Sequence, residues 1–97
     1  MRLIEFTRSP RSDKRFFARF MEPYRTVHFG TPRKNTYIDH GNVGIRDMHV
    51  LRRKSYLDEW NTINEETMTT GILWGPTQSV EGNLSRLLSH FNIQDDR

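Results

Sequence analysis

Residues 24–42 read Tyr-Arg-Thr-Val-His-Phe-Gly-Thr-Pro-Arg-Lys-Asn-Thr-Tyr-Ile-Asp-His-Gly-Asn, and here the chain changes from a basic, strand-like half to a helical, increasingly acidic half. Within this stretch, Arg25–Phe29 has the alternating pattern that is typical of a β-strand. Gly30 and Pro32 end the strand, because glycine adopts backbone angles that a Cβ would forbid and proline donates no ladder hydrogen bond. The junction therefore predicts an N-terminal sheet followed by C-terminal helices.

Two further strands are predicted before this stretch. Residues 3–7 form the first, and the Pro, Ser and Asp of residues 8–13 indicate a loop after it. Residues 15–21 form the second and place Phe16, Ala18 and Phe20 on one side. A turn at residues 22–24 returns the chain antiparallel, which adds Val27 and Phe29 to this aromatic face. We expect an antiparallel sheet of two or three strands, which needs helices on one face to be stable.

The second half has helical periodicity. Turn residues at positions 35–44 predict a loop. Residues 45–60 then predict a helix with one stripe at three- and four-residue spacing, formed by Ile45, Met48, His49, Arg52, Tyr56, Leu57 and Trp60. The spacing of Thr62 and Glu65 matches a capping box, which would open a short helix over residues 63–73 that Gly75 and Pro76 end.

The last helix has the clearest pattern. Thr77 could cap it, and its apolar residues fall on one face: Val80, Leu84, Leu87, Leu88 and Phe91. Residues 95–97 predict a frayed polar end. The chain is therefore predicted to be a single α+β domain over residues 1–97, with a small N-terminal antiparallel sheet of two or three strands packed against two or three C-terminal helices.

Charge is divided between the two halves of the chain. Residues 1–54 hold thirteen Lys and Arg against five Asp and Glu, whereas residues 55–97 hold two against seven. The basic half would attract phosphate or an acidic protein surface. Mean hydropathy is −0.80, which is low for an independent globule and favours a small fold that gains order within a larger assembly. No stretch approaches the roughly 20 apolar residues of a membrane span, and no signal sequence is visible.

Enzymatic and metal-binding functions are disfavoured by the motifs. There is no cysteine, and no glycine-rich phosphate loop or serine with a recognisable base partner occurs. His28, His40 and His49, with Asp39 and Asp47, match no known metal-site spacing, so we expect polar or capping roles for them. The sequence predicts no cofactor, no metal and no catalytic residue.

Ten basic residues form the candidate surface for a partner or for phosphate: Arg8, Arg11, Lys14, Arg15, Arg33, Lys34, Arg46, Arg52, Arg53 and Lys54. Aromatic residues interleaved with them could stack on nucleic-acid bases or contact a protein, but so small a core also needs them. These residues, predicted as contact or core, are Phe16, Phe17, Phe20, Tyr24, Tyr37, Trp60 and Trp74. A basic run on a helix can also be a solvated face, and the sequence leaves this alternative open.

The chain resembles a family of small basic proteins of unknown function encoded by large nucleocytoplasmic DNA viruses. The resemblance spans about residues 15–91 and consists of scattered positions: Thr26, His28, Phe29, Gly30, Tyr37, His40, Arg53, Tyr56, Trp60, Gly71, Leu73, Trp74, Pro76 and Thr77. It implies a viral origin, and through that a role in the virion or on the viral genome.

Two functions follow as expectations. The first is a non-enzymatic minor capsid or virion-associated protein, located in the virion and assembled in the host cytoplasm, that bridges larger proteins such as the major capsid protein. It would wedge its aromatic sheet and basic loops against its neighbours. The alternative is a viral DNA-binding or genome-packaging protein whose basic residues contact phosphates.

Overall fold

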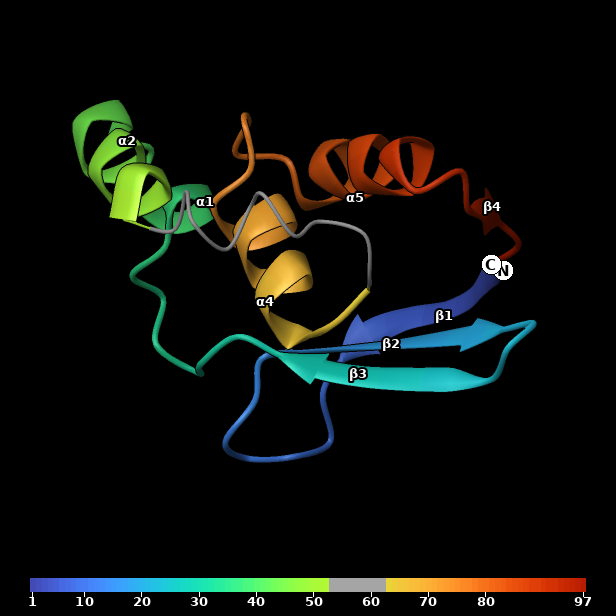
Figure 1. The fold of residues 1–97 in the computed structure, drawn as a ribbon. Helices are drawn as coiled ribbons and strands as arrows, with labels where there is room; N and C mark the ends of the chain where they lie inside the picture. Colours follow the sequence, from blue (N-terminus) through green and yellow to red (C-terminus); the bar gives the residue numbers. More distant parts are fainter. Residues whose placement is uncertain (53–62) are drawn as a thin grey trace.

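The computed structural model describes residues 1–52 and 63–97, and it has a sheet with helices over one face (Figure 1). Strands β1 (Arg2–Arg8), β2 (Phe16–Met21) and β3 (Arg25–Phe29) pair antiparallel, as predicted. A short strand, β4 (Gln94–Asp95), pairs parallel with β1. The sheet is therefore mixed, with the order β3-β2-β1-β4, and the predicted α+β class is confirmed.

Helices over the sheet come from the C-terminal half. Helix α4 (Glu65–Met68) continues directly as a π-helix, η1 (Thr69–Leu73), and a loop leads to α5 (Val80–His90). In Figure 1, α4 and α5 lie above the sheet, while α1 (Tyr37–His40) and α2 (Val43–Arg52) lie at one end of the molecule. The loop predicted for residues 35–44 is therefore partly wrong, because it contains α1 and the start of α2.

The core lies between the sheet and the helices. Phe20 and Phe29 are fully buried, and Ala18 and Val27 lie beside them, so the predicted aromatic face is the inner face of the sheet. From the helical side the core receives Met68, Ile72, Leu73, Leu84, Leu87 and Leu88. Gly30 has a positive φ of 79°, and a Cβ there would lie 2.8 Å from Leu73 Cδ1. Only glycine lets the end of β3 pass so close to η1.

Two predicted helix caps are corrected. Asn64, not Thr62, is the N-cap of α4, and its side chain accepts a hydrogen bond from Thr67 N; Thr62 itself lies outside the described residues. Ser79 caps α5 by accepting from Gly82 N. Thr77 instead donates its hydroxyl to the buried Asn83, which fixes the loop between η1 and α5.

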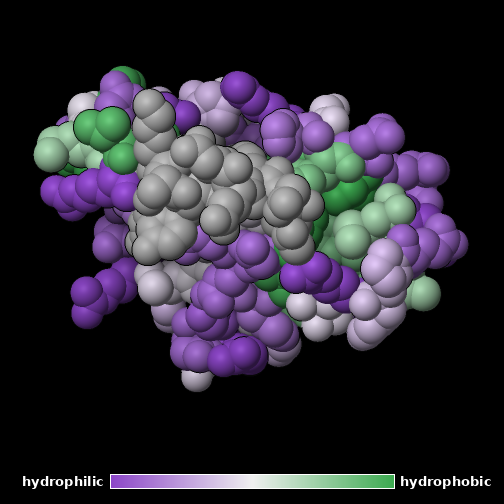
Figure 2. Space-filling view, in the orientation of Figure 1, coloured by the Kyte–Doolittle hydropathy of each residue, from purple (hydrophilic) through white to green (hydrophobic). Residues whose placement is uncertain are grey.

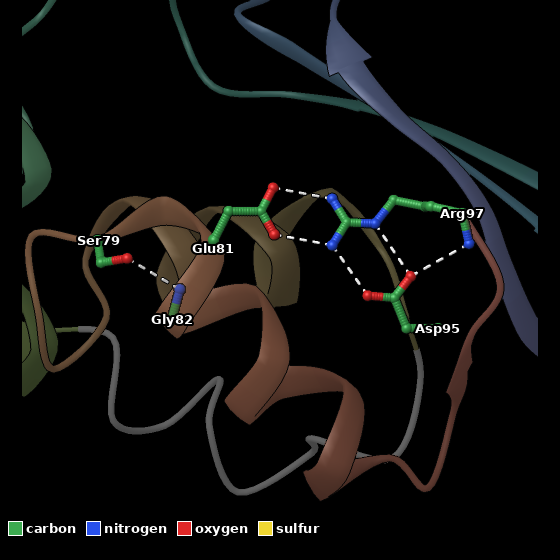
Figure 3. A network of polar contacts seen from close by, with 5 residues as sticks. All are labelled: Ser79, Glu81, Gly82, Asp95 and Arg97. Carbon is green, nitrogen blue, oxygen red and sulfur yellow. Dashed lines mark hydrogen bonds and ion pairs between the residues drawn. The ribbon is translucent and has the colours of Figure 1, made fainter.

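The C-terminal segment is ordered, so the predicted frayed end is wrong. Asp96 N donates to Leu3 O, which extends the pairing of β4 with β1. Figure 3 shows Arg97 bonded at once to Glu81 in the first turn of α5 and to Asp95, at 2.7–3.0 Å. These ion pairs hold the pKa values of both carboxyl groups below their usual range.

Candidate functional site

Two loops bring five of the ten predicted basic residues together at one end of the sheet. Arg15 N donates to the carbonyls of Phe29 and Gly30, and Ser9 N donates to Arg15 O, so the loop before β2 is fixed against the loop after β3. A hollow of about 370 Å³ opens there, which we call the basic hollow. It is lined by Arg8, Ser9, Arg11, Ser12, Lys14, Arg15, Phe16, Pro32 and Lys34. Among these described lining residues there is no carboxylate.

The cations of the basic hollow differ in what they already bind. Arg15 donates both Nη atoms to the Asp39 carboxylate at 2.7 and 2.8 Å, in a pair that is largely buried. These bonds and those from Thr36 hold the pKa of Asp39 far below its usual range. Arg15 therefore fixes the start of α1 and is not available to a partner, which corrects its assignment to the binding set.

Other cations around the hollow are paired at the surface or unpaired. Arg11 binds Asp13, and Lys14 binds Glu65. Within the described part of the chain, Arg8, Arg33 and Lys34 form no ion pair, and all three are exposed. Arg8 and Lys34 therefore line the hollow as exposed cations without an ion pair, and Arg33 directly precedes Lys34 in the sequence.

Helix α2 carries a second surface, which is apolar. No residue of α2 is buried, and four of its five large apolar side chains, Val43, Ile45, Met48 and Leu51, are 51–69% exposed, while Val50 is half-buried. We call these four residues the α2 apolar face, and Figure 2 shows hydrophobic atoms gathered over this end of the molecule. The helix contacts the body through its opposite side: the His49 ring stacks on Trp74 at 3.8 Å, and Arg46 Nε donates to Gly75 O.

The predicted helix over residues 45–60 is corrected in its start and its packing. It begins at Val43, where Asn42 accepts a hydrogen bond from Ile45 N, and it is described up to Arg52. Ile45 and Met48 point outward, because the polar side chains of Arg46 and His49 make the contacts with Trp74 and its loop. The remaining predicted helix and site residues, Arg53, Lys54, Tyr56, Leu57 and Trp60, lie outside the described residues.

The predicted aromatic residues separate into core and surface. Phe20 and Trp74 are buried and Phe16 and Tyr37 pack against the core, so none of them is a free contact residue. Phe17 is half-buried beside His28, and Tyr24 is 65% exposed. The expected wedge of sheet aromatics is thus largely internal, and the exposed apolar area lies on α2.

The predicted polar roles agree with the contacts of His28 and His40, whereas the ring of His49 stacks on Trp74. His28 Nδ1 lies 2.8 Å from Ser9 Oγ in a hydrogen bond, and His40 Nδ1 accepts from Asn42 N. Across residues 1–52 and 63–97, no three His, Asp or Glu side chains gather as a metal site would require.

Sequence reasoning missed some members of both surfaces. Ser9 and Ser12 line the basic hollow, and Val43 and Leu51 belong to the α2 apolar face. The start of the helix at Val43 could have been predicted, because Asn42 is a favourable N-cap immediately before an apolar residue. The serines gave no signal, because only the folded loop places their side chains beside the cations.

A family model described as "Family of unknown function (DUF5754)" matches residues 4–53, just over half of the chain. The matched part includes the lining of the basic hollow and the whole of the α2 apolar face. No curated protein and no solved structure matches the chain. None of the described helices has the length and apolar character needed to cross a bilayer.

Proposed function

The chain belongs to the DUF5754 family of unknown function, and we propose that it is a non-enzymatic structural protein of a large DNA virus particle. In this proposal it is a minor capsid or virion-associated component that joins two neighbours. The α2 apolar face seats on a larger virion protein, such as the major capsid protein. The basic hollow meets an acidic surface of a second neighbour. Location in the virion, assembled in the host cytoplasm, belongs to the same proposal.

The α2 apolar face carries the proposal. A helix with no buried residue contributes little to its own fold, yet this one exposes four large apolar side chains. In soluble proteins, contiguous exposed apolar patches mark surfaces that bind another protein or a membrane. Arg52, the last described residue of the helix, is exposed and adds a cation next to Leu51 in the sequence. Apolar centres with a polar rim are the usual anatomy of protein interfaces.

A charge substitution on α2 tests this proposal. The variant Met48→Glu with Leu51→Glu places two carboxylates on the α2 apolar face, where both side chains are more than half exposed, so the fold should be unaffected. Incorporation of the tagged protein into particles should fall at least about tenfold, because desolvating unpaired charges opposes docking. The matched control is Ser85→Glu with Ser89→Glu, which adds the same charge at exposed positions of α5. Equal incorporation of the two variants would exclude docking through α2.

The basic hollow favours one alternative function, a DNA-binding or genome-packaging protein. Two loops converge there, and the described lining residues include cations and two serines but no carboxylate. Backbone phosphates bind to such arrangements. Disruption of purified particles separates the two functions, because a structural component should stay with the DNA-free shell and a genome-binding protein should leave with the DNA.

A further inference from the structure

A second cavity, of about 300 Å³, lies between α2 and α5 and is separate from the basic hollow. Its lining includes Arg46 and Val50 from α2, Thr70 from η1, Trp74, and Arg86 and Leu87 from α5. This volume is at the lower end of the range for small-molecule sites. The elements around it are held together by Asn83, which donates to the carbonyls of Ile72 and Thr77.

The polar groups of this cavity have one sign of charge. Arg46 and Arg86 line it from two different helices, and no Asp or Glu is among its described lining residues. Arg86 is exposed and forms no ion pair with a described residue. Arg46 uses Nε for Gly75 O and Nη1 for Asp47, and its guanidinium group lies over the Tyr37 ring, while Nη2 has no hydrogen-bond partner in the described part of the chain. Both guanidinium groups can therefore donate to an anion.

Thr70 is the unusual residue of the lining. It is 5% exposed, and its Oγ1 is a buried side-chain atom without a hydrogen-bond partner. Leaving a buried hydroxyl unpaired costs about 1–3 kcal/mol, so such a group in a folded protein requires an explanation. Thr70 also lies in a π-helical turn, a conformation that is found frequently at functional sites. Both features indicate that this wall of the cavity serves something other than stability.

We propose that the cavity binds a small organic anion, a compact apolar body carrying a phosphate or carboxylate group. Arg46 and Arg86 bind the anionic group, and the apolar body packs among Val50, Trp74 and Leu87. Thr70 donates its hydroxyl to an oxygen of the ligand after a small adjustment of the cavity wall. The bound anion joins α2 to α5. The anion binds in this way whichever partner the α2 apolar face meets.

Phenyl phosphate is a suitable probe, because it combines a compact apolar ring with a phosphate group. In a titration of the full ¹⁵N-labelled chain, we expect saturable shifts of the backbone amides of Thr70, Gly71, Gly75 and Arg86. Phenol and inorganic phosphate, which each carry half of the ligand, should bind at least about tenfold more weakly. Binding of inorganic phosphate as tightly as phenyl phosphate would show that the apolar walls take no part, and would overturn the proposal.

Two variants test the assigned residues. Arg86→Ala should weaken phenyl phosphate binding about tenfold, as expected for one lost charge-assisted hydrogen bond, and should not unfold an exposed site. Thr70→Val should leave the melting temperature of the unliganded protein unchanged or raised, while it weakens binding about fivefold. Arg33→Ala removes the same charge outside the cavity and should bind like the original chain.

Three results would overturn the inference: shifts that do not saturate, equal affinity of the Arg86→Ala variant, or shifts that map to the basic hollow around Arg8 and Lys34. Unchanged affinity of the Thr70→Val variant would overturn the role of its hydroxyl.

Discussion

Two Arg–Asp pairs show how burial decides what a basic residue does. Arg11–Asp13 and Arg15–Asp39 both place two guanidinium nitrogens on one carboxylate. The side chains of the first pair are 52 and 61% exposed, and those of the second are 15 and 13% exposed. Exposed pairs contribute little to stability, whereas breaking a largely buried pair leaves a charge without a partner. Sequence spacing assigned both arginines to one binding set, because it carries no information on burial.

Asp39→Asn should therefore destabilise the fold at neutral pH, by roughly 1.5–3 kcal/mol, because Asp39 accepts charge-assisted bonds from Arg15 and further bonds from Thr36. The pKa of Asp39 is lower in the folded chain than in the unfolded chain. Its contribution is then complete above the unfolded pKa of about 4 and is lost as the pH falls further. Chemical denaturation at a series of pH values measures this. Below about pH 4, the free energy of unfolding of the variant should fall less steeply with decreasing pH than that of the original chain.

Asp13→Asn is the matched control. Its pKa is also lowered, by Arg11, but the pair is exposed, so the stability of this variant should follow the original chain at every pH. Equal losses from Asp39→Asn and Asp13→Asn would contradict the structural role of the Arg15–Asp39 pair.

At the level of the elements, local patterns predicted those strands and helices whose apolar residues face the core. The three N-terminal strands and α5 were predicted because their periodicity matches their burial. The packing of α2 was not predicted, because its periodic apolar residues face solvent and its polar side contacts Trp74. Strand β4 was missed because two polar residues pair with β1 only through their backbone. The burial of Asn83 was not predicted, because a polar residue in an apolar stripe gives no hydrophobic signal.

The packing of α5 against the core can be tested directly by its effect on stability. Leu84, Leu87 and Leu88 are buried, and Val80 and Phe91 pack against the core, as the pattern predicts. Leu87→Ala should cost roughly 2–5 kcal/mol, because it leaves a cavity between α5 and the sheet. This is a large part of the stability of a domain of this size, so a circular-dichroism melt should show a much lower melting temperature or an unfolded chain.

Ser85→Ala on the exposed side of α5 is the control, and it should melt within a few degrees of the original chain. A Leu87→Ala variant that melts like the Ser85→Ala variant would show that α5 does not hold the core together.

For the whole molecule, ion pairs between the two halves of the chain reduce the charge division seen in the sequence. The basic hollow lies at one end of the sheet, and some cations of the first half pair with carboxylates of the second, as Lys14 does with Glu65. The sequence predicted which half is basic, but not which cations remain free after folding. Arg15 is internal and Lys14 is paired, while Arg8, Arg33 and Lys34 form no ion pair with a described residue. A partner thus meets fewer cations than the sequence count suggests.

The number of cations without an ion pair around the basic hollow gives a prediction that separates the two proposed functions. Each neutralised phosphate contributes a slope of about −0.9 to the plot of log affinity against log salt. Contact through Arg8, Arg33 and Lys34 alone gives a slope of about −3 for duplex DNA. For a structural component of the shell, we expect weak, sequence-independent DNA binding with a slope no steeper than this. Fluorescence anisotropy with a labelled duplex at several salt concentrations measures both quantities.

The variant Arg8→Ser with Lys34→Ser should make the slope about 2 units shallower, because it removes two of the three phosphate contacts. The matched control, Arg25→Ser with Arg52→Ser, removes the same charge at positions that line neither the basic hollow nor the second cavity, and it should retain the slope. If the variant Arg8→Ser with Lys34→Ser also retains the slope, the phosphate contacts lie outside the basic hollow. Micromolar or tighter binding at physiological salt, together with loss of the protein from DNA-free shells, would exclude the structural role and favour genome binding, because three cations alone do not provide that affinity.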